Sequence, residues 1–208
     1  MDKYYYIIVF LLMFSFVLCM ANLLQLNKII GFFSNNQYYN SKSYDEIIPN
    51  LYIGNIDGAR KLSFLKDKKI KVIINCTKQI PNYYEDIKYN FEYYRVPIDD
   101  SLLDEDIDLM TILLPKYVNI IDNALKNNKP VFIHCYAGRQ RSASIIAAYL
   151  IFKYNLTIDE AYKLIISKRE ESFHYGKSFN FNKSLIDYYN NTVISKGKKN
   201  TIPTDIVF

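Results

Sequence analysis

One stretch decides the fold that we predict for this chain: His134-Cys135-Tyr136-Ala137-Gly138-Arg139-Gln140-Arg141-Ser142. It places a cysteine and an arginine at the two ends of a five-residue loop. The apolar run Val131–Ile133 enters the loop, and the small, apolar run Ala143–Leu150 leaves it with helical character. The stretch therefore predicts a loop that joins the end of a buried strand to the start of a buried helix.

This loop is predicted to bind an anion. Free backbone N–H groups at the start of a helix, together with the helix dipole, attract negative charge. A cysteine on such a loop has its thiolate stabilised, with a pKa lowered from about 8.5 to ~3.5–7.5. The arginine can grip a tetrahedral oxyanion through two parallel hydrogen bonds. The combination predicts hydrolysis of a phosphate ester through a covalent phosphocysteine on Cys135.

Composition and charge narrow the class of protein. The chain has 208 residues, 50% of them hydrophobic, which is enough for one domain with a substantial core plus extensions and excludes disorder of the whole chain. The net charge of +5 is mild and the lysines are dispersed apart from small clusters. We therefore expect no nucleic-acid partner, while the surplus lysine weakly favours anionic substrates or lipid headgroups. Cys19, Cys76 and Cys135 lie far apart, so they predict neither a disulfide framework nor a metal site.

The first 30 residues are predicted to form a hydrophobic helix. No charge occurs between Tyr4 and Asn27, and Tyr4–Ala21 is almost wholly apolar. A membrane-spanning helix needs about 20 such residues and a signal-peptide core about 7–15. Residues 1–30 therefore predict a single-pass membrane anchor, with a cleaved signal segment as the alternative. Because a catalytic thiolate works best in a reducing compartment, we expect the catalytic domain on the cytoplasmic side.

The remainder divides into a polar linker at 31–43, a catalytic domain at 44–190 and a flexible tail at 191–208. Within the domain, short apolar runs predict strands at Leu51–Gly54, Lys71–Cys76, Tyr93–Ile98 and Val131–Ile133.

Helical patterns separate these strands. Apolar residues between positions 107 and 125 predict a long helix, which Pro115 is expected to split or to restart as a first-turn proline. A capping box, Thr157–Glu160, opens another helix that runs through Ile166. The alternation of strands and helices predicts an α/β fold with a mainly parallel central sheet flanked by helices.

On these residues the chain resembles the dual-specificity protein phosphatases of the cysteine-dependent class. The loop 134–142 matches the motif of that family at every defining position, and the resemblance extends over about 44–188 through Ile48–Gly54, Ile73–Asn75 and Val96–Ser101. It implies the fold of that family. One stretch departs from the pattern: Lys177–Leu185 lacks the Pro-Asn pair and the glutamine that family members usually carry before and within the last helix.

The resemblance implies a role for each residue of the loop. Cys135 is the expected nucleophile and Arg141 the phosphate-binding side chain. Ser142 is expected to donate a hydrogen bond to the cysteine sulfur, and its alternative or additional role is that of the helix N-cap. His134 is expected to fix the loop, and Asn75 to support it from the end of a strand. The phosphate-binding loop is completed by Tyr136, Ala137, Gly138, Arg139 and Gln140. No metal or organic cofactor is expected, since thiolate, arginine and backbone amides supply the whole anion site.

A general acid must come from a separate loop. The resemblance aligns Asp100 with this role, and Asp99 is the competitor because a slip of one residue exchanges them. A nearby acidic cluster is interpreted as an exposed helix start: Asp104, Glu105, Asp106 and Asp108. Cys76 is interpreted as a small core residue, with a redox partnership with Cys135 as the alternative.

The expected substrates are phosphotyrosine and phosphoserine or phosphothreonine in proteins, because so short a domain predicts a shallow pocket. Arg139 and the hydrophobic N-terminal segment favour a second hypothesis, a membrane-associated phosphatase of phosphoinositides or phosphatidylglycerophosphate. A phospho-binding module without activity is the alternative from another class. Sulfur transfer of the rhodanese type also uses a cysteine on such a loop, but the match at His134 and Ser142 argues against it.

Overall fold

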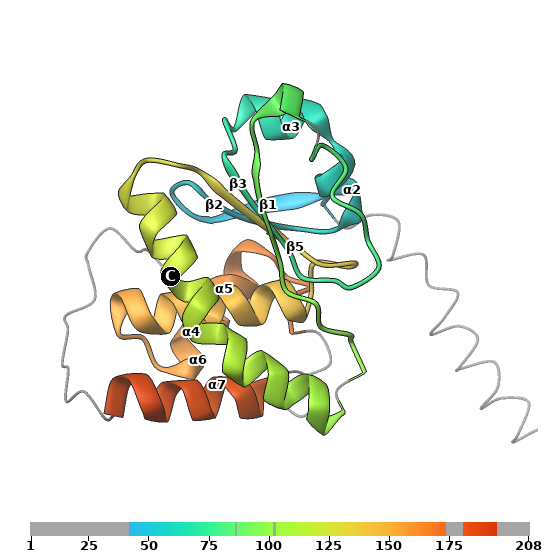
Figure 1. The fold of residues 1–208 in the computed structure, drawn as a ribbon. Helices are drawn as coiled ribbons and strands as arrows, with labels where there is room; N and C mark the ends of the chain where they lie inside the picture. The colour runs from blue at the N-terminus through green and yellow to red at the C-terminus, as the bar shows by residue number, and fades with distance from the viewer. Residues whose placement is uncertain (1–41, 86, 102, 174–180, 195–208) are drawn as a thin grey trace, which may run out of the picture. The chain divides into compact units, whose positions relative to one another are not determined.

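The computed structural model describes residues 42–85, 87–101, 103–173 and 181–194 (Figure 1). The hydrophobic helix predicted within 1–30, nearly all of the predicted linker and most of the predicted tail lie outside these residues. Within the described ranges, no helix is long and apolar enough to cross a membrane.

The described part of the chain is built around a five-stranded mixed sheet. The strands are β1 (Tyr44–Ile48), β2 (Leu51–Gly54), β3 (Val72–Asn75), β4 (Glu92–Arg95) and β5 (Val131–His134), in the order β1-β2-β5-β3-β4. β1 is antiparallel to β2, whereas the other three pairings are parallel. The α/β class is thus confirmed, and the sheet is mixed because a tight turn at Asn50, whose φ is 67°, folds β1 back along β2.

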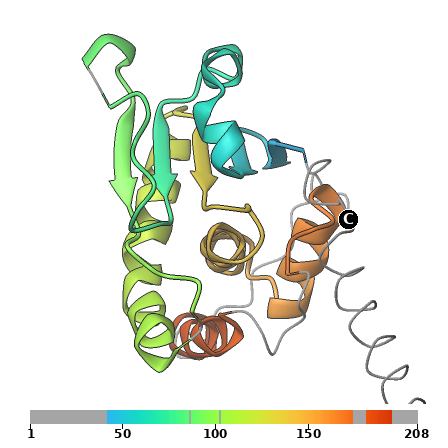
Figure 2. The ribbon, with the colours of Figure 1, turned by 90° about the vertical axis from the view of Figure 1, so that its right-hand side faces the viewer.

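Helices cover both faces of the sheet. On one face lie α2 (Ile56–Arg60), α3 (Leu62–Asp67) and the 3₁₀ helix η2 (Ile87–Tyr89). On the other lie α4 (Asp104–Lys126), α5 (Arg141–Tyr154), α6 (Ile158–Lys168), α7 (Asn182–Tyr189) and the short π-helical turn η4 (Asn190–Ile194). Figure 2 shows α5 nearly end-on, surrounded by the sheet, α4, α6 and α7.

Successive side chains of the central strands pack alternately into two separate hydrophobic cores, one on each face of the sheet. Ile53, Ile74 and Ile133 pack into the core around α5, while Tyr52, Ile73 and Phe132 pack beneath α3. Both faces are apolar because successive side chains of a strand point to opposite faces, and each face is covered. This double burial explains why the central strands are nearly continuous apolar runs.

Two local predictions have different outcomes. α4 runs unbroken through Pro115, so the expected split or restart there is wrong. Pro115 lies on the exposed side of the helix, where water can satisfy the carbonyl that loses its partner. The capping box that opens α6 is confirmed, because Thr157 Oγ1 accepts from the Glu160 N–H at 3.2 Å and the Glu160 carboxylate accepts from the Thr157 N–H at 2.7 Å.

Candidate active site

The loop between β5 and α5 closes on itself around the sulfur of Cys135. Its sharp bend is at Gly138, whose φ is 67° and whose hypothetical Cβ would lie 2.6 Å from the carbonyl oxygen of Gly54. Only glycine fits this combination of backbone conformation and close approach. The loop is also tied to α2, since the carbonyl of Tyr136 accepts from the Ile56 N–H at 3.0 Å.

Cys135 is buried with its sulfur surrounded by donors. Only 1% of its surface is exposed, and Sγ accepts hydrogen bonds from the Gly138 N–H at 3.2 Å and the Ser142 hydroxyl at 3.4 Å. Burial alone would raise the pKa of the Cys135 thiol. The positive charge of Arg141 and hydrogen bonds from Ser142 and the Arg139 backbone outweigh it, so this pKa lies below its usual value. The site therefore favours a thiolate.

Ser142 lies inside the helix rather than at its cap. The N-cap of α5 is Gln140, and Ser142 is fully buried one residue after the first helical position. The alternative assignment of Ser142 as N-cap is therefore wrong. Its hydroxyl is instead available to the sulfur of Cys135, as the resemblance implied.

Arg141 presents a buried guanidinium to the same loop. Its side chain is 7% exposed, Nη1 donates to the Ile98 carbonyl at 3.2 Å, and Nη2 lies 3.5 Å from Oδ2 of Asp100. Its Nε has no hydrogen-bond partner among the described residues. A buried donor without a partner costs about 1–3 kcal/mol. An anion in the loop would satisfy it, so this donor set fits a phosphate group.

The two neighbouring aspartates face different partners. The Asp99 carboxylate accepts from Lys78 Nζ at 2.8 Å and Gln79 Nε2 at 2.9 Å, and these hydrogen bonds lower the pKa of Asp99. The carboxylate of Asp100 points instead toward Arg141, with its side chain 43% exposed. The structure thus brings Asp100, not Asp99, to the rim of the cysteine loop.

Asp106 binds the residues on either side of Asp100, in the segment 99–101 that we call the acidic loop. Asp106 is buried, with 8% of the residue exposed, and its carboxylate accepts from the Asp99 N–H at 3.2 Å and from the Ser101 hydroxyl. Its expected place in an exposed helix start is therefore wrong, although the other three acids of that cluster are exposed. In a capping box, an acidic side chain in the first turn of a helix accepts hydrogen bonds from donors that precede the helix. The same pattern in the sequence could have identified Asp106.

Asn75 supports the loop that carries Asp99 and Asp100, and it does so indirectly. Its side-chain amide donates to the Ile80 carbonyl at 2.9 Å and to Asn82 Oδ1 at 3.0 Å, and its oxygen accepts from Thr77 at 2.7 Å. These bonds organise the turn after β3 that carries Lys78. Asn75 thus lies behind the contacts that hold Asp99.

Arg169 is a residue that sequence reasoning missed. Its side chain is fully buried, with Nε donating to the Gly138 carbonyl at 2.8 Å and Nη2 to the Ala137 carbonyl at 3.3 Å. Nη1 donates to Asp45 Oδ2 at 2.8 Å, which links the loop to β1. By holding two loop carbonyls on the outside, Arg169 favours the loop conformation whose N–H groups face the sulfur. No local signal marks it, because Asp45 is 124 positions away.

His134 and Cys76 are buried next to the nucleophile. Burial lowers the pKa of His134 to about 4, so the imidazole is neutral at pH 7, and its ring stacks on Phe132 at 5.6 Å. Nδ1 lies 3.4 Å from the Cys135 carbonyl. These contacts support a role in fixing the loop. Burial raises the pKa of the Cys76 thiol, which suits a core residue; its redox partnership stays a prediction.

The other loop side chains form the rim and the wall. Tyr136 is 55% exposed and Arg139 is partly buried. Gln140 is buried, and neither its amide oxygen nor its amide nitrogen has a hydrogen-bond partner among the described residues. Nowhere in the described part of the chain do three or more histidine, cysteine or acidic side chains converge as metal ligands would.

Comparisons with known proteins agree with this geometry. Residues 51–191 match the family model described as "Dual specificity phosphatase, catalytic domain". The chain is 32% identical to mouse dual specificity protein phosphatase 6 over 159 residues, which are 76% of this chain and 40% of that protein. It is 34% identical to human dual specificity protein phosphatase 9 over 143 residues, which are 69% of this chain and 35% of that protein. The chain thus spans less than half the length of these relatives.

Solved structures agree on the fold. The crystal structure of a mouse putative dual specificity phosphatase complexed with zinc tungstate superposes with a TM-score of 0.63 at 24% identity, covering 74% of this chain and 91% of that one. Human DUSP28 superposes with a TM-score of 0.63 at 20% identity, covering 72% and 95%. At these identities the likeness concerns the fold alone.

Proposed function

This chain belongs to the dual specificity phosphatase family, and we propose that it hydrolyses phosphotyrosine, phosphoserine and phosphothreonine in proteins. One observation carries the proposal: the sulfur of Cys135 accepts hydrogen bonds from Gly138 and Ser142, while Arg141 and Asp100 converge on the same loop. Nucleophile, phosphate-binding fork and acid then lie around one anion site.

In the first step, the Cys135 thiolate attacks phosphorus and forms an S–P bond as the P–O bond to the substrate breaks. Arg141 and the loop N–H groups bind the phosphoryl oxygens and stabilise the charge that spreads over them. Asp100, in its protonated form, donates its proton to the departing phenoxide or alkoxide oxygen. The dephosphorylated protein leaves with a neutral side-chain hydroxyl.

In the second step, water attacks the phosphocysteine. The Asp100 carboxylate accepts a proton from that water as its oxygen bonds to phosphorus, and the S–P bond breaks. The Ser142 hydroxyl, 3.4 Å from Sγ, donates to the departing sulfur and eases its release as thiolate. Inorganic phosphate leaves, and Asp100 is again protonated.

The openness of the site supports a broad choice of phosphorylated side chain. The acid lies at the rim, where Asp100 and Tyr136 are substantially exposed, while Arg141 and Cys135 lie beneath. A short phosphoserine can reach such a site as well as a longer phosphotyrosine.

The test is a panel of para-nitrophenyl phosphate, a phosphotyrosine peptide and a phosphothreonine peptide. We expect all three to be hydrolysed, and Cys135→Ser to abolish turnover while a bound phosphopeptide is retained. A wild-type chain that binds the phosphopeptides without hydrolysing any substrate would instead be a phospho-binding module. That result would reject the proposal.

A second candidate, a lipid phosphatase, is favoured by the basic side chain of Arg139 within the loop and by the predicted hydrophobic segment at 1–30. Vesicles containing phosphatidylglycerophosphate or a phosphoinositide test it beside the peptide panel. Turnover of lipid alone, lost in Arg139→Ser, would replace the protein substrate with a lipid.

We further propose that the segment 1–30 anchors the chain in a membrane with the catalytic domain on the cytoplasmic side. The chemistry supports this side, because a thiolate nucleophile requires a reducing compartment. Protease protection of the full-length chain in sealed vesicles tests it. A shortened mature N-terminus would show cleavage of a signal segment instead.

A further inference from the structure

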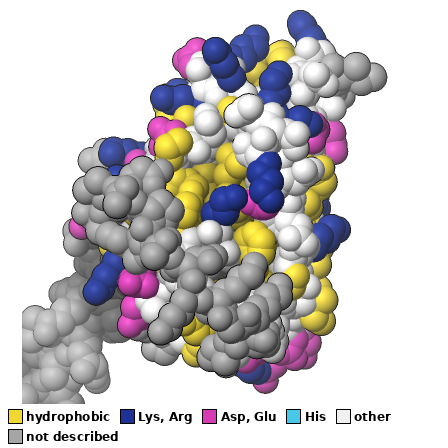
Figure 3. All heavy atoms as spheres, turned by 90° about the vertical axis from the view of Figure 1, so that its left-hand side faces the viewer, with side chains coloured by type: hydrophobic (Ala, Val, Ile, Leu, Met, Phe, Trp, Pro, Cys, Tyr) yellow, Lys and Arg dark blue, Asp and Glu magenta, His cyan; other side chains and the backbone are white. Residues whose placement is uncertain are grey.

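A basic hollow lies at the end of the sheet where α3 and η2 meet. It has a volume of about 410 Å³ and no acidic side chain among the described residues lines it. Four lysines and two aromatic rings contribute most of its wall: Lys66, Lys69, Lys71, Lys88, Tyr89 and Phe91. Figure 3 shows lysine and arginine side chains gathered at this upper end of the molecule.

The lysines of the basic hollow have charges that the described residues do not neutralise. None of the four forms an ion pair within the described ranges, whereas Lys78, Lys129 and Lys153 each pair with a carboxylate at 2.6–2.9 Å. Lys66 and Lys88 lie instead over the ring of Tyr89, at 5.4 and 5.9 Å from its centroid. Aromatic faces hold the ammonium groups in place without cancelling their charge. The hollow therefore presents a concentrated positive potential.

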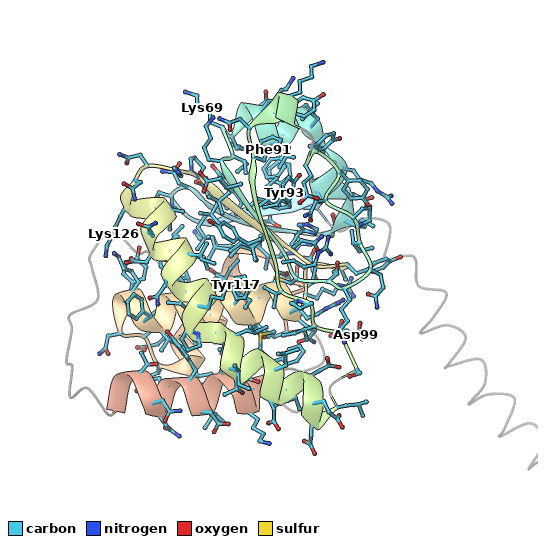
Figure 4. The ribbon with its side chains drawn as sticks, in the orientation of Figure 1. Lys69, Phe91, Tyr93, Asp99, Tyr117 and Lys126 are labelled. Atoms are coloured by element: carbon cyan, nitrogen blue, oxygen red, sulfur yellow. The ribbon has the colours of Figure 1, made fainter. Side chains whose placement is uncertain are left out.

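This hollow is remote from the cysteine loop. Lys71 precedes β3 and Phe91 precedes β4, whereas the loop follows the opposite, carboxyl end of the parallel strand β5. Four residues of strand separate the two ends by ~13 Å. Figure 4 shows Lys69 and Phe91 at one end and Asp99 at the other. A phosphate held by Arg141 therefore cannot contact these lysines, and the hollow is a second anion-binding feature.

We propose that the basic hollow docks an acidic segment of the phosphoproteins on which the chain acts. Only the identity of the partner as a substrate rests on the proposed function. A concave wall of lysine and aromatic side chains accepts carboxylates of an extended segment, while methylene groups of that segment pack on Tyr89 and Phe91. At about 3.3 Å per residue, a span of ~13 Å requires at least about four residues between the acidic run and the phosphorylated residue.

A membrane surface is the less suitable occupant. If the hollow lay on anionic lipid, the cysteine loop at the opposite end of the sheet would face away from that surface. A flat lipid surface would also leave the concave part of the hollow unfilled. A flexible protein segment can fill the hollow and reach round to the loop at the same time.

The test uses a labelled, unphosphorylated peptide with a run of glutamates, followed by fluorescence anisotropy with the full-length protein. The hollow variant carries three charge reversals: Lys66→Glu, Lys71→Glu and Lys88→Glu. The control variant carries the same change in net charge on exposed lysines of α4 and α6: Lys116→Glu, Lys163→Glu and Lys168→Glu. Lys116 is a close match, because it too lies over a tyrosine ring, at 5.4 Å from the centroid of Tyr117.

We expect salt-sensitive binding by the wild type, weakened about tenfold or more in the hollow variant and unchanged in the control variant. Hydrolysis of para-nitrophenyl phosphate should be the same in all three proteins. A peptide that carries both the glutamate run and a distant phosphotyrosine should show a lower kcat/KM in the hollow variant alone.

Binding of the same proteins to phosphatidylserine vesicles is measured beside the peptide. Three results would overturn the docking proposal: no peptide binding by the wild type, equal loss of peptide binding in both variants, or a hollow variant that loses vesicle binding but keeps peptide binding. The last would indicate a membrane instead. Failure of the proposed function is separate, since it would appear as absent hydrolysis of para-nitrophenyl phosphate in the wild type, whatever the peptide does.

Discussion

Replacing Asp106 with alanine should impair the acid step without touching the phosphate site. Asp106 accepts hydrogen bonds from the Asp99 N–H and the Ser101 hydroxyl, the residues on either side of Asp100. Each hydrogen bond to a charged group contributes about 1.5–3 kcal/mol. Partial exposure of the donors reduces the sum, so we expect the free energy of unfolding to fall by about 2–4 kcal/mol.

In Asp106→Ala, the residues on either side of Asp100 lose the hydrogen bonds that hold them, so Asp100 becomes more mobile and catalysis should be slower. General acid catalysis contributes about 10²–10⁴-fold, and a misplaced acid should lose about 10–100-fold of this in kcat. The loss should grow with the pKa of the leaving group. It should be small for an activated aryl phosphate, which needs little protonation, and large for a phosphoserine peptide, whose alkoxide requires a proton. Inhibition by inorganic phosphate should stay unchanged, since Arg141 and the cysteine loop are intact.

The assay is kcat measured on a series of aryl phosphates with graded leaving-group pKa, plus one phosphoserine peptide, at a temperature where the variant is folded. Asp104→Ala is the matched control, because Asp104 belongs to the same first turn of α4 but is exposed. Asp100→Asn should show the same dependence on the leaving group, only steeper. A uniform loss across the series, or weaker inhibition by phosphate, would show that Asp106 acts on the phosphate loop, and the reasoning would be wrong.

Three other perturbations test the phosphate loop itself. Arg169→Met should raise the pKa of the Cys135 thiol, seen as an upward shift in the pH dependence of its alkylation by iodoacetamide. It should also cost about 3–5 kcal/mol of stability, because Asp45 and Glu171 would keep largely buried charges without their cationic partner. An unchanged alkylation profile would limit Arg169 to stability. Gly138→Ala should lower Tm and abolish turnover, because its Cβ would lie 2.6 Å from the Gly54 carbonyl at a φ of 67°; wild-type activity would contradict the close approach. For His134, a folded pKa of about 4 against 6.5 means that protonation opposes folding. The free energy of unfolding therefore has its full His134 contribution above pH 6.5 and loses it as the pH falls toward 4, by about 3 kcal/mol in all. Urea titrations of His134→Gln should lack this part of the acid destabilisation.

Local sequence was sufficient for the centre of the site. Cys135 directly follows β5 and Arg141 begins α5, so their spacing alone places them at the two ends of one strand-to-helix loop. The Thr157–Glu160 capping box is equally local, and its two hydrogen bonds form as predicted. Pro115 shows the limit of such rules, because a proline is tolerated inside α4 when its side of the helix faces water.

The partners of that centre depended on tertiary contacts. The resemblance put Asp100 ahead of Asp99 as the acid, but a slip of one residue would have exchanged them. Only the tertiary structure shows that Lys78 and Gln79 engage Asp99 and that Asp100 lies against Arg141. Asp106 is buried only because the acidic loop folds back over the start of α4. Arg169 reaches the loop from the end of α6 and joins it to a residue 124 positions earlier. Hydrogen bonds across such separations leave no periodic trace in a sequence, whereas a strand–loop–helix carries its geometry within a dozen residues.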